Sequence, residues 1–390
     1  MNEWHSQRYL DEGRKAGVDE NILRRAVATA EYTLSVPCPG PPILTLGHLA
    51  HLSGVEARRL HSYIARDGDD PYREFTIRKR PIPGQRPRYR FIAVPEPLLL
   101  QVQTWITRKV LNPAQCHLAS KAFAPGSQLI KAAADHCEAQ WLIKIDIRDF
   151  FESITEIDAY RVFRKRGYQA LIAFQLTRLC TRLRDKHRDP EARIPARRRS
   201  DIRDNHRSKL VYRERPMGVL PQGAPTSPML SNLAAYDLDQ SLSKLAWENG
   251  LRYSRYADDL TFSTRAKSFG RSRAKHTIGQ VYRILIARGW SPNRAKTVVV
   301  PPGARKVVLG LLVDKRRPRL SREFRSRLRM HLYFIAHARH GPVQHAKARG
   351  FSSVEGLRQH LLGLVAFAGQ IDALYADSCR REMCEADWSR

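Results

Sequence analysis

Residues 254–263, SRYADDLTFS, place two aspartates side by side between runs of β-favouring residues. The alternation on either side predicts two strands joined by a tight turn at Asp258 and Asp259. Asp favours turns, so an ordinary acidic turn is one interpretation. A turn needs one Asp at most, however, and two adjacent carboxylates repel each other unless a bound cation neutralises their charge. The stretch therefore predicts either a plain turn or part of a metal site.

A third carboxylate lies about a hundred residues upstream, in WLIKIDIRDFF (141–151). The alternation predicts a strand with Trp141, Ile143 and Ile145 on one face and Leu142, Lys144 and Asp146 on the other. If this strand lies beside the hairpin in an antiparallel sheet, Asp146 joins Asp258 and Asp259. Three such carboxylates can hold two Mg²⁺ ions about 3.5–4 Å apart and promote an in-line phosphoryl displacement. Three other acidic residues are interpreted as solvated: Asp149, Asp237 and Asp239.

The composition indicates a polyanionic partner. The chain has 390 residues, a formal net charge of +30 and an apolar fraction of 42%. Self-repulsion on this scale favours binding to nucleic acid, with an anionic membrane surface as the alternative. The N-terminus lacks the apolar core of a signal peptide, and the longest apolar stretch, near 361–369, is too short to span a membrane. The six cysteines have no CxxC spacing and predict reduced thiols, so we expect a cytoplasmic protein.

Helical and strand-like segments alternate irregularly along the chain, which predicts an α+β fold. Residues 1–36 are expected to be helical and to end before the proline-rich segment 37–42. YREFTIRKR and RPRYRFIAV predict a basic two-stranded hairpin. Residues 185–212 are basic, nearly free of large apolar residues, and interpreted as an insertion. VLPQGAPTSPMLSNL begins as a Gly/Pro turn and is expected to become a helix near Ser227, with that hydroxyl as its N-cap.

Three motifs then stand in a specific order: KIDIRDFF, LPQGAPTSPMLSNL and YADDL. Over about residues 43–370 the chain resembles a retron-type bacterial reverse transcriptase. The resemblance implies a right-hand polymerase fold whose palm is an antiparallel sheet with helices. It also implies four regions: an N-terminal helical extension (1–42), fingers (43–135), a palm with a basic insertion (136–300), and a primer grip with a helical thumb (301–390).

The resemblance also implies roles for individual residues. Asp146, Asp258 and Asp259 match the catalytic, metal-binding aspartates. Phe151 matches a steric gate against a nucleotide 2′-hydroxyl, whereas core packing suits its neighbour Phe150 better. Glycine permits close backbone approach, and Lys or Arg favours phosphate. The expected dNTP-binding residues are Lys79, Arg90, Phe151, Gln222, Gly223 and Lys296.

Nucleic-acid contacts are expected on the thumb side of the site. Gly310, in VLGLL, resembles the primer grip, and the residues Arg322, Arg325 and Arg329 follow one another on a predicted helix. A solvated helix face is the alternative for these arginines. FAPGSQLIKAAADH resembles a retron segment of the form NAxxH, with His136 retained as an expected contact. Ala132 replaces its Asn, and Leu309 replaces the Thr of a VTG motif.

A retron enzyme would copy part of a cognate structured noncoding RNA into single-stranded DNA. It would start from an RNA 2′-hydroxyl and leave a branched RNA–DNA hybrid. The implied partners are that RNA, its DNA, dNTPs, two Mg²⁺ ions and a separate effector protein in anti-phage defence, with no membrane. The alternatives are another bacterial reverse transcriptase (abortive-infection, diversity-generating or intron type), a non-catalytic RNA-binding scaffold, or a metal-dependent nuclease.

Overall fold

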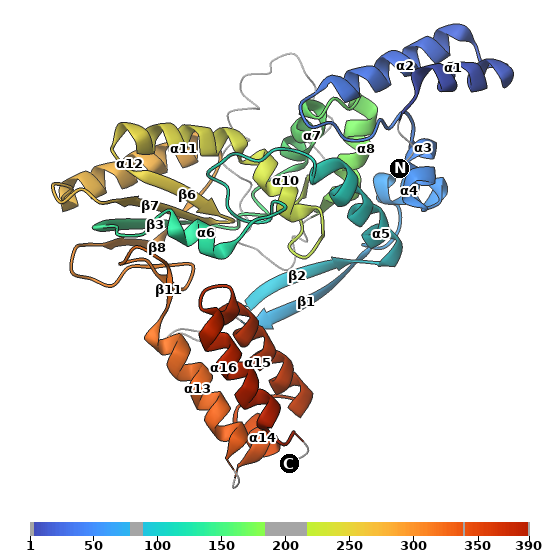
Figure 1. The fold of residues 1–390 in the computed structure, drawn as a ribbon. Helices are drawn as coiled ribbons and strands as arrows, with labels where there is room; N and C mark the ends of the chain where they lie inside the picture. The colour runs from blue at the N-terminus through green and yellow to red at the C-terminus, as the bar shows by residue number, and fades with distance from the viewer. Residues whose placement is uncertain (1–3, 79–88, 184–216, 338–339, 389–390) are drawn as a thin grey trace.

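The computed structural model describes residues 4–78, 89–183, 217–337 and 340–388. Lys79 and the basic insertion predicted at 185–212 lie outside these residues. Helices and antiparallel sheets are mixed along the chain, which confirms the predicted α+β class (Figure 1). Within the described residues, no helix is both long and apolar enough to cross a membrane.

The N-terminal third is mostly helical. Its helices are α1 (Ser6–Lys15), α2 (Glu20–Ser35), α3 (Leu46–Ser53), α4 (Ala57–Ala65), α5 (Pro97–Ile106) and the π-helix η1 (Thr107–Leu111). Asp19 caps α2 by accepting hydrogen bonds from the amides of Asn21 and Ile22. Between α4 and α5 the predicted basic hairpin is present. It consists of the antiparallel strands β1 (Tyr72–Arg78) and β2 (Tyr89–Pro95).

A four-stranded antiparallel sheet lies at the centre, in the order β6-β7-β3-β8. Its strands are β3 (Trp141–Ile147), β6 (Arg252–Tyr256), β7 (Asp259–Thr264) and β8 (Pro292–Val300). The predicted alternation of β3 is confirmed by its packing. Trp141, Ile143 and Ile145 belong to one hydrophobic core, and Leu142 belongs to another. The two faces of the sheet therefore have different neighbours.

The larger core joins the Ile143 face of the sheet to the surrounding helices. Figure 1 shows α11 and α12 lying across this face. The elements around it are α7 (Glu156–Lys165), α8 (Ala170–Cys180), α10 (Ser227–Ala234), α11 (Tyr236–Glu248), α12 (Arg271–Ala287) and the short pair β4 (Arg182–Leu183) and β5 (Gly218–Val219). Because apolar burial is the main favourable term in folding, this side fixes the sheet in place.

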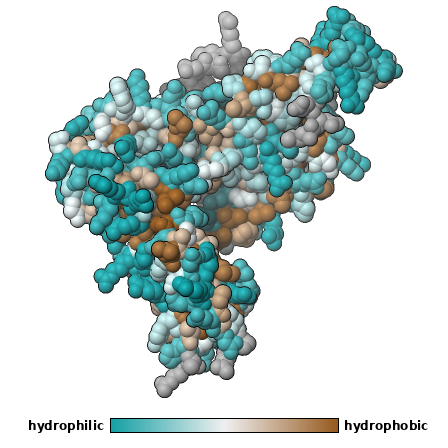
Figure 2. Space-filling model, viewed as in Figure 1, coloured by the Kyte–Doolittle hydropathy of each residue, from teal (hydrophilic) through white to brown (hydrophobic). Residues whose placement is uncertain are grey.

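The C-terminal part forms a separate helical lobe with its own core, which Leu142 of β3 joins. A small sheet leads into it, made of β9 (Val307–Val308), β10 (Leu311–Leu312) and β11 (Arg319–Leu320). The lobe consists of α13 (Arg322–Ala336), α14 (Gly341–Ala348), α15 (Val354–Gly369) and α16 (Ala373–Glu385). Figure 2 shows a notch between this lobe and the body of the molecule, with apolar residues gathered along it.

Two local expectations are wrong. The N-cap of α10 is Thr226, and Ser227 is the first helical residue, whose buried hydroxyl donates to the carbonyl of Pro221. His136 follows α6 (Leu129–Ala134) and is 1% exposed. Its two ring nitrogens are hydrogen bonded to the hydroxyls of Ser254 and Ser263, each at 2.7 Å. His136 thus joins β6 to β7 and leaves no ring nitrogen for nucleic acid.

The burial of His136 predicts a loss of stability in acid. Burial lowers the pKa of this imidazole from 6.5 to about 4. The unfolded chain therefore binds a proton that the folded chain excludes, and the contribution of His136 is lost as pH falls below about 6.5. From about pH 6.5 to about pH 5, the free energy of unfolding should fall by about 2 kcal/mol more in the wild type than in His136→Gln.

Urea unfolding at a series of pH values measures this difference. Gln is the matched variant because its amide can both donate and accept at the two serines without titrating. Equal pH slopes in the two proteins would contradict a neutral, buried His136.

Candidate active site

The hairpin turn and the sheet register bring the three aspartates together. Asp146 of β3 and Asp259 of β7 are directly opposite each other. Tyr256 of β6 pairs with Asp259, so Ala257 and Asp258 form the two-residue loop. The sequence placed the turn at the two aspartates, whereas Asp259 is already the first residue of β7. One aspartate thus lies in the loop and the other two lie in adjoining strands.

Asp146 is held from the neighbouring strand β8. Lys296 Nζ lies 2.7 Å from Asp146 Oδ2, and Asn293 Nδ2 donates to Oδ1 at 2.9 Å. The register explains how both residues reach one carboxylate. Lys144 pairs with Val298 and Asp146 pairs with Asn293, so two residues along β3 correspond to five along β8, and β8 is bulged there. The bulged strand turns extra side chains toward the site, and sequence periodicity gives no signal for Asn293.

Burial and mutual repulsion act on the loop aspartate. Burial, Asp259 and Asp146 together raise the pKa of Asp258 to about 6. Burial also raises the pKa of Asp259, to which Asp146 adds, while Lys144 and Lys296 oppose the increase. The site therefore holds more negative charge than its own lysines neutralise, which is a favourable setting for a cation.

The donor chemistry suits a hard divalent ion, because the site offers several carboxylate oxygens next to one another. Among the described residues, however, no group of three or more His, Cys, Asp or Glu side chains is arranged to hold a metal. Asp146 is instead bound to Lys296 and Asn293. A metal ion would therefore compete with the Lys296 ammonium for Asp146.

A cavity of about 480 Å³ opens beside the aspartates. Asp146 and Asp259 line it together with the cationic residues Lys144, Lys296 and Arg305. Its other walls are Ile145 of β3 and valines of β8 and β9. A pocket lined by both acids and cations suits a ligand that carries both phosphate and metal.

The Gly223 loop packs directly onto the β1–β2 hairpin. The amide of Ala93 donates to the carbonyl of Gln222 at 2.8 Å. Gly223 has φ +123°, and a Cβ there would lie 2.8 Å from the carbonyl oxygen of Ala93. Only glycine satisfies both constraints. Arg90 is exposed on β2 and pairs with Ile77. It lies on the same face of the hairpin as Ile92, and the Ile92 side chain packs against the Gly223 loop.

Phe150 packs in the core, as the sequence predicts, and Phe151 packs against the edge of the same core. Phe150 is 4% exposed and stacks on Trp290, with ring centroids 5.3 Å apart. Phe151 is half-buried, and its ring lies 6.1 Å from that of Phe123. Phe123 also lies 6.4 Å from Tyr256, which precedes the loop. Sequence reasoning missed Phe123, which completes an aromatic row next to the aspartates.

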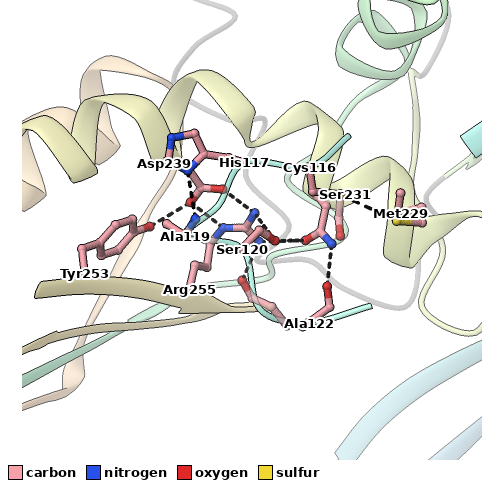
Figure 3. A network of polar contacts seen from close by, with 12 residues as sticks. Cys116, His117, Ala119, Ser120, Ala122, Met229, Ser231, Asp239, Tyr253 and Arg255 are labelled. Carbon is pink, nitrogen blue, oxygen red and sulfur yellow. Dashed lines mark hydrogen bonds and ion pairs between the residues drawn. The ribbon is translucent and has the colours of Figure 1, made fainter. Parts of the chain in front are cut away.

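A buried ion pair lies beneath the hairpin, and it corrects the expectation that Asp239 is solvated. Asp239 and Arg255 both have side chains that are 0% exposed, and their closest atoms are 2.6 Å apart (Figure 3). Tyr253 donates a further hydrogen bond to Asp239 at 2.9 Å. Periodicity could have placed Asp239 inward, because Leu238 and Leu242 on α11 are also buried.

The predicted thumb-side residues fall into different settings. Leu309 and Gly310 form a tight turn between β9 and β10, both with positive φ (+50° and +82°). Arg322 and Arg329 are exposed on α13. Arg325 instead forms an ion pair with Asp372 at 2.6 Å and lies over the ring of Tyr375. Arg325 therefore joins two helices of the lobe.

Comparisons with known proteins agree with this geometry. Residues 77–307, more than half of the chain, match the family described as reverse transcriptase (RNA-dependent DNA polymerase). The retron Ec86 reverse transcriptase of Escherichia coli is 29% identical over 75% of this chain and 78% of its own. Two reverse transcriptases of Myxococcus xanthus are also similar. The retron Mx162 enzyme is 32% identical, and the match covers 60% of this chain and 46% of the relative. The retron Mx65 enzyme is 30% identical, and the match covers 77% of this chain and 62% of the relative.

The family match covers β3, the Gly223 loop and the YADD hairpin, which together form the site. The order of these elements and the convergence of their carboxylates fit a polymerase that joins nucleotides on a template. The chain therefore belongs to the reverse transcriptase family, the RNA-directed DNA polymerases, and is of the retron type.

Proposed function

We propose that this protein copies part of a cognate structured noncoding RNA into single-stranded DNA, starting from a 2′-hydroxyl of that RNA. The observation that carries the proposal is the convergence of Asp146, Asp258 and Asp259, two of which line a cavity together with cations. In each step a hydroxyl oxygen attacks the α-phosphorus of a dNTP. A new P–O bond forms, the bond to pyrophosphate breaks, and the hydroxyl loses its proton.

The aspartates would hold two Mg²⁺ ions. Bound there, the metal would lower the pKa of the attacking hydroxyl and neutralise charge on the leaving pyrophosphate. Asp146 and Asp258 are the principal ligands in this proposal, and Asp259 supports them. The raised pKa of Asp258 supports this assignment, because a bound cation would offset both the burial and the repulsion from Asp259 and Asp146 that raise it.

The cationic residues would bind the triphosphate. Lys296 already bonds to Asp146, and its release on metal binding would free the ammonium for a phosphate oxygen. Arg90, on the hairpin that contacts the Gly223 loop, would approach from the opposite side. Lys79 has the same proposed role, as do Gln222 and Gly223 along the incoming nucleotide.

The lobe and the body would enclose the nucleic acid. Gly310 would allow the backbone to approach the primer end, and Arg322 and Arg329 are exposed cations suited to a duplex backbone. The net charge of +30 supports an RNA partner. We also propose a separate effector protein and a role in phage defence, on the likeness to retron enzymes alone.

Asp258→Asn tests the catalytic assignment. The amide removes one negative charge and a metal-binding oxygen, so DNA synthesis on RNA should fall by at least about 1,000-fold while RNA binding is retained. Primer extension with dNTPs and Mg²⁺ measures the rate, and filter binding measures the RNA affinity.

The matched control is Asp237→Asn, an equally sized change at an exposed carboxylate that pairs with Lys165 on the surface. Its activity should equal that of the wild type. Full activity in Asp258→Asn would refute the metal assignment, and loss of RNA binding would point to misfolding.

Phe151→Ala tests the sugar gate. Removing the ring should raise ribonucleotide incorporation relative to deoxyribonucleotide by about tenfold or more, because the clash with a 2′-hydroxyl is lost. Competition between dNTP and rNTP in primer extension measures the ratio. Phe150→Leu is the control, since that ring packs in the core and should affect Tm but not sugar selectivity.

The nucleic acid that co-purifies from cells tests the retron-type priming. Sequencing should find one RNA species joined to a short DNA, and a debranching enzyme should separate the two strands. Linear DNA extended from a 3′-hydroxyl would instead indicate one of the other bacterial types.

A further inference from the structure

The ion pair beneath the hairpin forms a complete hydrogen-bond network around one guanidinium. Arg255 lies on β6, and its side chain points to Asp239 on the helix-covered face (Figure 3). Arg255 pairs with Leu260, the neighbour of Asp259, so the register places Arg255 on the face opposite Asp259. Nε and Nη2 donate to the two oxygens of Asp239, at 2.8 and 2.6 Å. Nη2 also donates to Ser120, and Nη1 donates to Asn232 at 3.2 Å. The fifth donor contacts the carbonyl oxygen of Ala257, also at 3.2 Å.

This last contact reaches the catalytic loop. Ala257 precedes Asp258 and has φ +56°, a conformation that disfavours a residue with a Cβ. Its carbonyl is held by Arg255, and the next carbonyl, that of Asp258, accepts from the amide of Ile147 at 2.9 Å. Ile147 directly follows Asp146 in β3. The two successive carbonyls of the loop are therefore held by different strands, one by the Arg255 side chain of β6 and one by the Ile147 amide of β3.

The position of Arg255 is itself fixed from three directions. Asp239 on α11 orients the guanidinium in a bidentate pair, which allows little rotation. The Arg255 amide donates to the carbonyl of Ala119, and its carbonyl accepts from the amide of Lys121. The guanidinium also lies 5.6 Å from the ring of Phe150. Because the guanidinium is fixed, its hydrogen bond also fixes the position of the Ala257 carbonyl.

Stability alone does not account for an ion pair at this depth. A buried pair can often be replaced by apolar residues of similar volume at little or no cost in stability. Apolar residues would fill the space between β6 and α11, but they could not donate to Ala257. Among the hydrogen bonds that the guanidinium donates, this is the one that reaches the loop.

We propose that Arg255 is a positioning residue for catalysis: oriented by Asp239, it holds the Ala257 carbonyl and so sets the place of the Asp258 carboxylate. This inference rests on the proposed metal-dependent polymerase activity. Without the hydrogen bond the hairpin still folds, but the loop relaxes and the carboxylate moves from its productive position. A misplacement of about 1 Å can cost about 100-fold in rate.

The double variant Arg255→Met/Asp239→Leu separates positioning from folding, because it removes the charges together and keeps the space filled. We expect a Tm near that of the wild type and a kcat about 100-fold lower, with KM for dNTP within about threefold. Mn²⁺ binding, followed by electron paramagnetic resonance without substrate, should weaken by about tenfold. A folded double variant with wild-type kcat and Mn²⁺ affinity would overturn the proposal.

Arg255→Lys covers the case in which the double variant does not fold. It keeps a cation opposite Asp239 but lacks the planar fork that reaches both Asp239 and Ala257. The same loss of kcat and Mn²⁺ affinity is expected, and wild-type values in this variant would also overturn the proposal.

Tyr253→Phe is the matched control. It removes a hydrogen bond to the same carboxylate, from the same strand, without touching the Ala257 contact. It should lower Tm and leave kcat and Mn²⁺ affinity unchanged; an equal loss of kcat would assign the effect to general destabilisation. If the wild type makes no DNA, the proposed function fails, whereas an active wild type with an equally active double variant refutes only the role of Arg255.

Discussion

The antiparallel pairing of β3 with β7 places Asp146 directly opposite Asp259, and the geometry of the whole site depends on this register. Side chains alternate between the two faces of a strand, so a slip of one residue would turn Asp146 toward the helices. The apolar face of β3 prevents such a slip, because Ile143 and Ile145 would leave the main core. Hydrophobic burial on one face of the sheet thus fixes the carboxylates on the other.

The charged groups on the two faces of the sheet are balanced on one face and unbalanced on the other. On the helix-covered face, Arg255 and Asp239 neutralise each other and satisfy their hydrogen bonds within the protein. On the other face, burial and the repulsion from Asp259 and Asp146 raise the pKa of Asp258. The satisfied network is suited to hold backbone in place, and the unsatisfied one is suited to bind ions. The loop residue Ala257 lies where the two meet.

Local signals in the sequence predicted those parts of the site whose partners are close by in the chain. The alternation around Asp146 and the presence of a tight turn after Tyr256 follow from side-chain periodicity, although the turn lies at Ala257 and Asp258, one residue earlier than predicted. The sequence misassigned Asp239, His136 and Arg325 because their partners lie elsewhere: Arg255, two serines on β6 and β7, and Asp372 at the N-terminus of α16. An acidic or basic residue looks solvated until its counter-ion is known.

The sequence by itself determined the chemistry of this protein: three motifs in order specify the carboxylates, the glycine loop and the basic surroundings that a nucleotide polymerase needs. Only the tertiary structure decided how that chemistry is held. The bulge that brings Asn293 and Lys296 to Asp146, and the buried pair that supports Ala257, join residues from different elements. A sequence motif shows which residues occur together within one segment of the chain. The contacts between separate segments depend instead on how the sheet packs against its helices.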